Sequence, residues 1–433
     1  MPVQSCPSSL RYSLFGKFLS LSTNTGREKY KNCLFLGSSP SYIYIREDYF
    51  VQRVFKIDRG FEGGRFFLMF TEELFDKGVA LANLNKFDEA IVCFDEILKF
   101  NPKNADALYN KGVALIGLEL YEEAIIYFSE SLKINPYNAD ALNNLGVAYT
   151  AVKKFEKAIT YFDKVLGMNP NHELVLINKG GALAKLKKYE EAIVYFDKVL
   201  SINPDNVDVL YNKGVTLANL ARYTDAIACY DLVLRANQTN ADALNNKGVA
   251  LAALERYEEA IVCFNRVLAI NPKYLRALHN KGHSLARLKK HDEAIACYDE
   301  VLSFSPHNAD SLNNKGVALD ELKKYDESIA CYDEALRFNP NNPDALNNKG
   351  VALVALERYD EALLCYEQSL MVNPEDLLVI VNKGRVLVKL KRYPEALACF
   401  NAVLQVNPEN ADALYNKGVA LTALASNEAA STH

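Results

Sequence analysis

Apolar and polar positions follow one fixed period along most of the chain. Glycine recurs every 34 residues from Gly78 to Gly418, without insertion or deletion. Around each glycine the apolar residues lie three to four positions apart, as Leu244, Gly248 and Leu251 do. This is the spacing of side chains on one face of an α-helix. The period therefore predicts a helix at the same place in every 34-residue repeat.

Each repeat predicts two helices joined by short turns. The first opens with an asparagine such as Asn240, which is suited to cap the helix start, and Asp242 follows near the positive helix terminus. The second helix opens with acidic residues and ends before a proline such as Pro272, because proline cannot continue a helix. Ten such repeats span residues 71–410, and half a repeat follows at 411–424.

Small residues at fixed places indicate how the two helices pack. Gly248 and Ala260 are small enough to let the paired backbones approach closely, and Phe264 and Leu268 are expected to fill the space to the next repeat. A single helical pair cannot bury its apolar faces, whereas a row of stacked pairs can. The sequence therefore predicts an all-α solenoid that is stabilised by contacts between neighbouring repeats.

The 34-residue period, with glycine, alanine, an aromatic residue and proline at these offsets, resembles the tetratricopeptide repeat family over residues 71–424. The resemblance implies an α-solenoid superhelix of right-handed sense, with the first helices lining a concave groove. Leucine stands where the family often has tryptophan, as at Leu108, and a lysine such as Lys111 precedes most of the glycines. We expect the lysine stem to lie along apolar surface with its head in water.

The repeats leave two flanking segments. Residues 1–70 form a non-repeating, aromatic-rich segment in which 41–45 and 49–57 are candidate strands. This segment is short and irregular for a domain, so it either docks on the first repeat or is disordered. Alternatively, the native chain starts near Met69. The small, polar residues 425–433 predict a frayed tail, behind a half repeat that caps the last apolar edge.

A column of asparagines is the main candidate for a binding site. In every repeat after the first, an asparagine lies two residues before the glycine, opposite the face that packs on the second helix. An amide offers two donors and an acceptor, so it can pair with both backbone groups of an extended peptide. Such a ladder is similar to the one lining the groove of the O-linked sugar transferases of the family. The alternative is that the amides bond to neighbouring helices and brace the stack, and the two roles are compatible. The column consists of Asn110, Asn144, Asn178, Asn212, Asn246, Asn280, Asn314, Asn348, Asn382 and Asn416.

The seventh repeat carries a basic stripe on the first helix. Arg276, His279, His283 and Arg287 follow at spacings of three to four residues, so they share one side of the helix. They are candidate contacts for an acidic side chain or a phosphate of a partner, and the alternative is a solvated face. The two histidines also have the spacing of zinc ligands. No acidic residue lies between them and no third ligand is evident, so no metal is predicted.

Seven cysteines share one position on the second helices. Neighbouring helices pack about 8–10 Å apart, whereas a disulfide requires Cα atoms within about 4.4–6.8 Å. The cysteines are therefore expected to be free thiols that act as small packing groups, which fits a reducing compartment. They are Cys93, Cys229, Cys263, Cys297, Cys331, Cys365 and Cys399.

Charge and hydropathy disfavour two classes of partner. Residues 1–70 carry a net charge of +5 and residues 71–433 a net charge of −10, so the acidic repeats match a nucleic-acid backbone poorly. No apolar run reaches the ~18–20 residues that span a bilayer, so no membrane is predicted as a partner. Arg11 and Lys17 interrupt the apolar start, which argues against a secretory signal and favours a cytoplasmic protein. The Ser-rich, acid-poor start leaves an organelle transit peptide as the alternative.

The sequence contains no motif that predicts catalysis. No activated nucleophile, phosphate-binding glycine loop or paired carboxylate stands out, so neither an enzyme nor a cofactor is predicted. Family members that grip a chaperone carboxylate use Lys and Arg where this chain has Asp, Asn and Val, so such a clamp is not expected. We predict a scaffold that binds an extended peptide or a partner protein along the concave groove. The alternative is a substrate-presenting subunit of a peptide-modifying enzyme such as an O-linked glycosyltransferase.

Overall fold

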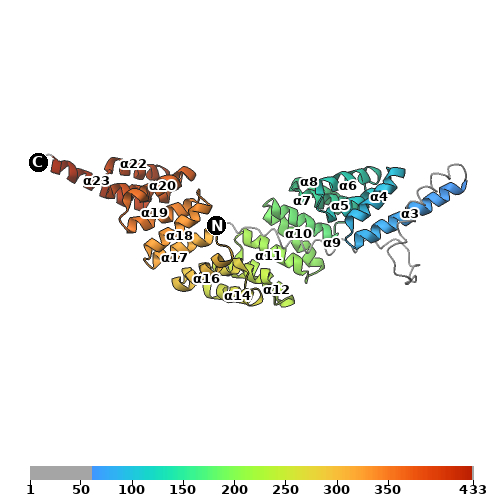
Figure 1. The fold of residues 1–433 in the computed structure, drawn as a ribbon, viewed down its shortest axis with the longest axis horizontal. Coiled ribbons are helices and arrows are strands. Elements are labelled where there is room, and N and C mark those ends of the chain that lie inside the picture. The colour runs from blue at the N-terminus through green and yellow to red at the C-terminus, as the bar shows by residue number, and fades with distance from the viewer. Residues whose placement is uncertain (1–60, 432–433) are drawn as a thin grey trace. The chain divides into compact units, whose positions relative to one another are not determined.

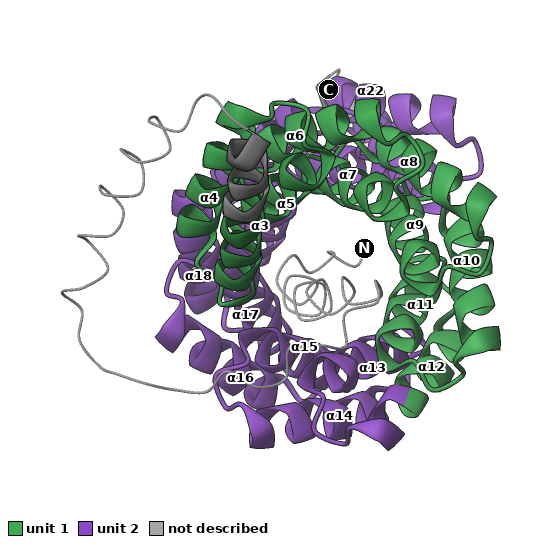
Figure 2. Ribbon diagram, turned by 90° about the vertical axis from the view of Figure 1, so that its right-hand side faces the viewer, with its two compact units in different colours: residues 1–232 green, residues 233–433 purple. Residues whose placement is uncertain are grey.

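The computed structural model describes residues 61–431, and every regular element in that range is an α-helix. Two helices fall in each 34-residue period, at the places that the sequence predicts. The chain divides into two compact units, residues 1–232 and residues 233–433 (Figure 2). The predicted all-α solenoid of helical pairs is confirmed. The candidate strands at 41–45 and 49–57 lie outside the described residues.

The helices follow the order of the repeats, with the labels of Figure 1. The first helices are α3 (Phe61–Asn83), α5 (Ala105–Gly117), α7 (Ala139–Ala151), α9 (Glu173–Lys185), α11 (Val207–Asn219), α13 (Ala241–Ala253), α15 (Leu275–Arg287), α17 (Ala309–Glu321), α19 (Pro343–Ala355), α21 (Leu377–Lys389) and α23 (Ala411–Ser431). The second helices are α4 (Phe87–Phe100), α6 (Tyr121–Ile134), α8 (Phe155–Met168), α10 (Tyr189–Ile202), α12 (Tyr223–Ala236), α14 (Tyr257–Ile270), α16 (His291–Phe304), α18 (Tyr325–Phe338), α20 (Tyr359–Val372) and α22 (Tyr393–Val406).

Each unit consists of two layers of helices. In unit 1 the first helices α5, α7, α9 and α11 lie on the inner side of the curve, and the second helices α6, α8 and α10 lie on its outer side (Figure 2). In unit 2 the first helices α13, α15 and α17 lie inside, and α14, α16 and α18 lie outside. The first helices therefore form one continuous side of each unit.

Local hydrogen bonds set where the helices begin and where the chain reverses. Asn240 caps α13 as predicted, since its side chain accepts a hydrogen bond of 2.9 Å from the backbone N–H of Ala243. After the same helix, Glu255 adopts a left-handed conformation with φ 61°. The N–H of Arg256 then donates to the carbonyl of Leu251 at 2.9 Å and closes the helix end. A left-handed residue recurs at this place in all ten complete repeats, so each pair reverses direction within a few residues.

The glycine of each repeat forms the notch that seats the second helix. A Cβ atom added to Gly248 would lie 2.6 Å from the ring of Phe264, which is fully buried. The glycines of all ten complete repeats have an aromatic ring within 3.0 Å in the same way. The ring thus packs inside its own repeat, because only glycine leaves room for so close an approach. The ring also reaches the next repeat, as the sequence predicts, since Phe94 shares a cluster with Ala107 and Ala114 of the following repeat.

Small residues of the first helix make the contact with the preceding repeat. Ala107 and Ala114 of α5 are fully buried, and they share a cluster with Phe94 and Ile97 of α4. Each repeat thus covers the apolar edge of the one before it. The stack is stabilised by these neighbour contacts, as expected for a solenoid.

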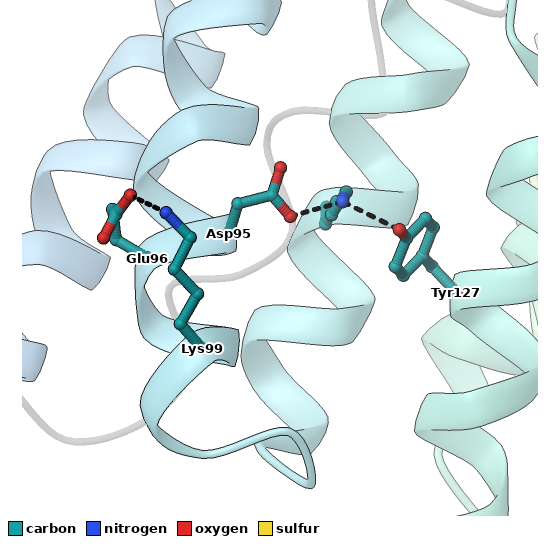
Figure 3. A network of polar contacts seen from close by, with 5 residues as sticks. Asp95, Glu96, Lys99 and Tyr127 are labelled. Carbon is teal, nitrogen blue, oxygen red and sulfur yellow. Dashed lines mark hydrogen bonds and ion pairs between the residues drawn. The ribbon is translucent and has the colours of Figure 1, made fainter.

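The lysine before the glycine makes a polar link between repeats. The ammonium group of Lys111 forms an ion pair with Asp95 of the preceding repeat and donates to the hydroxyl of Tyr127 at 2.8 Å (Figure 3). Lys111 is only 8% exposed, so the expectation that its head lies in water is wrong. The link to the acidic residue 16 positions earlier is also made by Lys179, Lys213, Lys315, Lys349 and Lys383.

The cysteines of the repeats are free thiols, as the sequence predicts. Five of the seven are buried and the other two are half-buried. Burial raises the pKa of five of these thiols, so they stay protonated near neutral pH and pack as small apolar groups. The raised values belong to Cys229, Cys297, Cys331, Cys365 and Cys399.

Two predicted boundaries differ in the structure. Helix α3 begins at Phe61, before the predicted start of the repeats at residue 71, and the rest of the predicted N-terminal segment lies outside the described residues. Helix α23 runs to Ser431 and so includes residues 425–431, where the sequence predicts a tail. The left-handed residue that ends the first helix of every complete repeat is missing at position 425, so the helix continues.

Candidate functional site

One side-chain face of the first helices forms the candidate binding surface. In most first helices an aspartate lies four residues before the column asparagine and a valine lies three residues after it, so the three share this face. In α17 they are Asp310, Asn314 and Val317, of which Asp310 and Val317 are exposed and Asn314 is half-buried. We call these positions and their equivalents in other repeats the inner face, because the first helices lie on the inner side of each unit (Figure 2).

The asparagines of the inner face are linked from repeat to repeat. Asn348 Nδ2 donates to Oδ1 of Asn313, 35 residues earlier, at 3.2 Å, and Asn382 donates to Asn347 at 3.1 Å. We call each hydrogen bond from a column asparagine to the residue 35 positions earlier a rung. A rung forms where that earlier residue can accept a hydrogen bond. The rungs join Asn144 to Tyr109, Asn178 to Asn143, Asn280 to Asn245, Asn314 to His279, Asn348 to Asn313 and Asn382 to Asn347.

Other members of the column lie on the same face with different partners. Asn110 donates to the backbone carbonyl of Asp106 on its own helix at 2.8 Å, because Phe75, 35 residues earlier, cannot accept. Asn416 likewise bonds within its own helix, and Val381 stands 35 residues before it. The remaining members, Asn212 and Asn246, are half-buried.

The acceptors of the rungs are positions that the sequence analysis did not single out. They directly precede the column, so several repeats contain the dipeptide Asn-Asn, as at Asn313–Asn314 and Asn347–Asn348. That doubling is a visible signal in the sequence. Its meaning depends on the stacking of repeats, because only stacking brings residues 35 positions apart into hydrogen-bond distance.

Asn144 is only 6% exposed and its Oδ1 already accepts from Asn143 at 3.2 Å, so this member of the column is enclosed. The rungs do not use the full hydrogen-bonding capacity of the other column amides. Each rung uses one N–H of the column amide, and an amide has a second N–H and a carbonyl oxygen as well. A rung also fixes the orientation of the side chain. Ordering that side chain on binding then costs less conformational entropy.

His279 takes the place of an asparagine in this ladder. Its Nε2 lies 3.2 Å from Nδ2 of Asn314, and its Nδ1 lies 2.9 Å from Oγ of Ser311. An amide nitrogen only donates, so Nε2 accepts, Nδ1–H donates to Ser311, and the ring is neutral. Burial first, and then the neighbouring His283, lower the pKa of His279 below its ordinary 6.5. Both ring nitrogens are engaged, and we therefore leave His279 out of the anion contacts proposed below.

Replacing His279 with asparagine is expected to reduce the acid sensitivity of the protein. Because the folded pKa of His279 is lowered, the unfolded chain takes up a proton more readily, and the wild type loses stability as the pH falls below about 6.5. The His279→Asn variant keeps an acceptor for Asn314 but has no titrating ring. Melting curves by circular dichroism, compared between about pH 7.5 and about pH 5, measure the difference. An equal loss of stability in both proteins would contradict this assignment.

The other three residues of the basic stripe are exposed on α15. The Arg276 guanidinium lies 5.4 Å from the ring centre of Tyr274, and that of Arg287 lies 5.7 Å from the ring centre of Tyr257. The pKa of His283 is lowered, mainly by desolvation of its ring and to a smaller extent by the positive charge of Arg287. Helix α15 has no acidic residue in its first turn, unlike α13 and α17, so this part of the inner face is locally basic.

Residues 61–431 contain no cluster of three or more His, Cys, Asp or Glu side chains that could hold a metal ion. This includes the pair His279 and His283, whose spacing alone resembles that of zinc ligands. Over the same residues no helix is both long enough and apolar enough to cross a membrane.

Comparison with known families identifies the repeat. Models described as "Tetratricopeptide repeat" match nine segments, which together cover well over half of the chain. The segments are residues 75–139, 139–172, 174–206, 195–228, 241–274, 275–308, 309–342, 331–363 and 349–415. No curated protein matches the chain as a relative.

Several solved structures are similar to parts of the chain. The chain is 24% identical to YrrB, described as a TPR protein with an unusual peptide-binding site, with a TM-score of 0.38 over 43% of this chain and 97% of YrrB. A tetratricopeptide repeat protein from Parabacteroides merdae is 17% identical, with a TM-score of 0.47 over 57% of this chain and 98% of its own. Yeast Tom70 is 13% identical, with a TM-score of 0.41 over 83% and 96%.

Proposed function

Because the chain belongs to the tetratricopeptide repeat family, we propose that it is a protein-interaction scaffold that binds an extended segment of a partner protein along the inner face. The observation that carries the proposal is the column of amides, which recurs in every repeat after the first and is held in place by the rungs. An extended peptide presents N–H and C=O groups in alternation, and a row of fixed amides can pair with both without reading its sequence.

Exposed apolar side chains beside the amides add to the same surface. Val317 is 38% exposed and Val351 is 45% exposed, and each lies one helical turn after a column asparagine. Contacts with valine side chains favour apolar side chains of the bound segment. Amides would then hold the backbone of the partner, while the valines and the neighbouring aspartates select among side chains.

A pair of double variants separates binding from bracing. Asn348→Ala with Asn382→Ala removes two column amides, whereas Asn313→Ala with Asn347→Ala removes the same two rungs from the acceptor side. Both doubles are expected to lose about 1–2 kcal/mol of stability, since each lost hydrogen bond contributes about 1 kcal/mol or less. The column double is expected to lose binding partners by about tenfold, in affinity purification quantified by mass spectrometry. The acceptor double is expected to lose much less, because its column amides remain and are only less ordered.

The acceptor double serves as the matched control for stability. If both doubles recover the same amount of partner as the wild type, the inner-face amides do not bind. If both lose partner equally, the loss follows from the broken rungs and not from peptide contacts. Either outcome removes the amide column as the binding site.

The exposed residues of α15 are proposed to receive an acidic or phosphorylated side chain of the bound segment. Arg276 and Arg287 carry permanent charge, and His283 lies between them on the helix face. The double variant Arg276→Gln with Arg287→Gln is expected to reduce partner recovery at low salt and to have little effect at high salt, because salt screens exposed charges. A salt-independent loss, or no loss, would contradict an anion contact.

A further inference from the structure

The last described helix presents an apolar face that is covered in the other repeats. Helix α23 docks on α22 through Ala413 and Ala420, which are fully buried. On its other side Leu414 is 51% exposed and Leu421 is 48% exposed. The equivalent leucines of repeat 9, Leu346 and Leu353, are 4% and 0% exposed because the second helix α20 covers them.

The notch of this helix is also open. In each complete repeat an aromatic ring lies within 3.0 Å of the place where a Cβ of the glycine would be, but at Gly418 no atom comes within 4 Å. Tyr415, one turn before, is 73% exposed. In α5 the equivalent Tyr109 packs on the inserted ring of Phe128, with ring centres 5.8 Å apart. We call Leu414, Tyr415, Gly418 and Leu421 the open notch.

A positive charge lies beside the open notch. In six repeats the lysine equivalent to Lys417 forms an ion pair with an acidic residue 16 positions earlier. At that distance before Lys417 the chain has Asn401, which carries no charge. The same lysines also lie near the acidic first turn of the second helix. The pKa of Glu361 in α20 is lowered by its hydrogen bond with Arg358 first, and by the charge of Lys349 as well. Lys417 therefore favours an acidic helix start at this place.

We propose that the open notch docks an amphipathic helix of a partner protein, with an acidic first turn followed by alanine and, four residues later, by phenylalanine or tyrosine. This is the chemistry of the second helices that fill the ten other notches, as in Glu259, Ala260 and Phe264 of α14. A second copy of this chain is a poorer fit, because each second helix among the described residues is already seated on the glycine of its own repeat. Tyr415 lies beside the inner-face positions Asp412 and Val419 on α23, but the proposal does not depend on the function proposed for the inner face.

The test uses the full chain and a synthetic probe. The probe is a fluorescent peptide with the sequence of residues 257–270, carrying Cys263→Ser to prevent oxidation, titrated by fluorescence anisotropy. Saturable binding is expected. A peptide with Phe264→Ala should bind at least about tenfold more weakly, because the notch then holds no ring. A peptide with Glu258→Gln and Glu259→Gln should bind more weakly at low salt than the parent peptide.

A matched pair of protein variants locates the binding. Gly418→Leu places a side chain in the open notch and should weaken peptide binding at least about tenfold. Gly167→Leu makes the same change at another helical glycine with nothing within 4 Å, and should leave binding unchanged. Both substitutions favour helix, so neither threatens the fold.

Three outcomes would overturn the proposal. The first is the absence of saturable binding by the wild type. The second is equal binding by Gly418→Leu and the wild type, which would place the peptide elsewhere. The third is sedimentation of the wild type as a dimer that Gly418→Leu dissociates, which would make a second copy the occupant.

Discussion

Replacing Phe264 with alanine is expected to lower the free energy of unfolding by about 3–5 kcal/mol, the usual cost of removing a large buried ring. Phe264 is fully buried, and its ring fills the notch of Gly248. Without the ring, α13 and α14 lose one of the buried contacts between them. The stability of a solenoid is largely local, so the loss should concentrate there and in α15, which packs on α14.

Hydrogen exchange with mass spectrometry, together with urea denaturation, measures this effect. Peptides from α13, α14 and α15 should exchange faster in the Phe264→Ala variant, and the first urea transition should move to lower concentration. Val262→Ala is the matched control, because Val262 is on the same helix but 58% exposed, and its change should stay within about 0.5 kcal/mol. If the two variants behave alike, the notch does not hold the repeat together.

Replacing glycine with alanine is expected to have opposite effects on stability at two of the repeat glycines, Gly248 and Gly418. At Gly248 the new Cβ would lie 2.6 Å from the buried Phe264 ring, so the ring or the helix must shift, and overpacking of this kind costs about 1–3 kcal/mol. At Gly418 the new Cβ meets nothing within 4 Å. There alanine should stabilise α23 by up to about 1 kcal/mol, because alanine favours helix over glycine.

The pair tests the close approach rather than helix propensity. Both glycines lie inside helices, so propensity alone would make both variants more stable. Urea midpoints of Gly248→Ala and Gly418→Ala, measured beside the wild type, report the sign of each change. A stabilised Gly248→Ala variant would show that the Phe264 ring moves aside freely. It would contradict the claim that this position requires glycine.

The sequence was sufficient for the elements and their order. The 34-residue period, the asparagine caps and the prolines after the second helices place both helices of each repeat, because these signals act within a few residues of the helix ends. The free state of the cysteines also follows from the period. One position that recurs on successive parallel helices is too far from its equivalents for a disulfide.

Expectations about side-chain partners were less successful. Lys111 was expected to reach water but pairs with Asp95, and the close contact of the Phe264 ring with Gly248 of its own repeat was not foreseen. His279 was grouped with the exposed basic residues, yet it accepts from Asn314. Each of these partners lies between 16 and 35 residues away in the sequence.

The sequence by itself determined the all-α repeat architecture, the identity of the inner-face positions and the register in which they recur. Only the tertiary structure decided that the amides brace one repeat against the next, that the lysines are paired, and that one notch stays open at Gly418. The physical reason is the range of the interactions. Caps, turns and helical periodicity depend on neighbours in the chain, whereas rungs, ion pairs and notches exist only once helices from different parts of the sequence lie side by side.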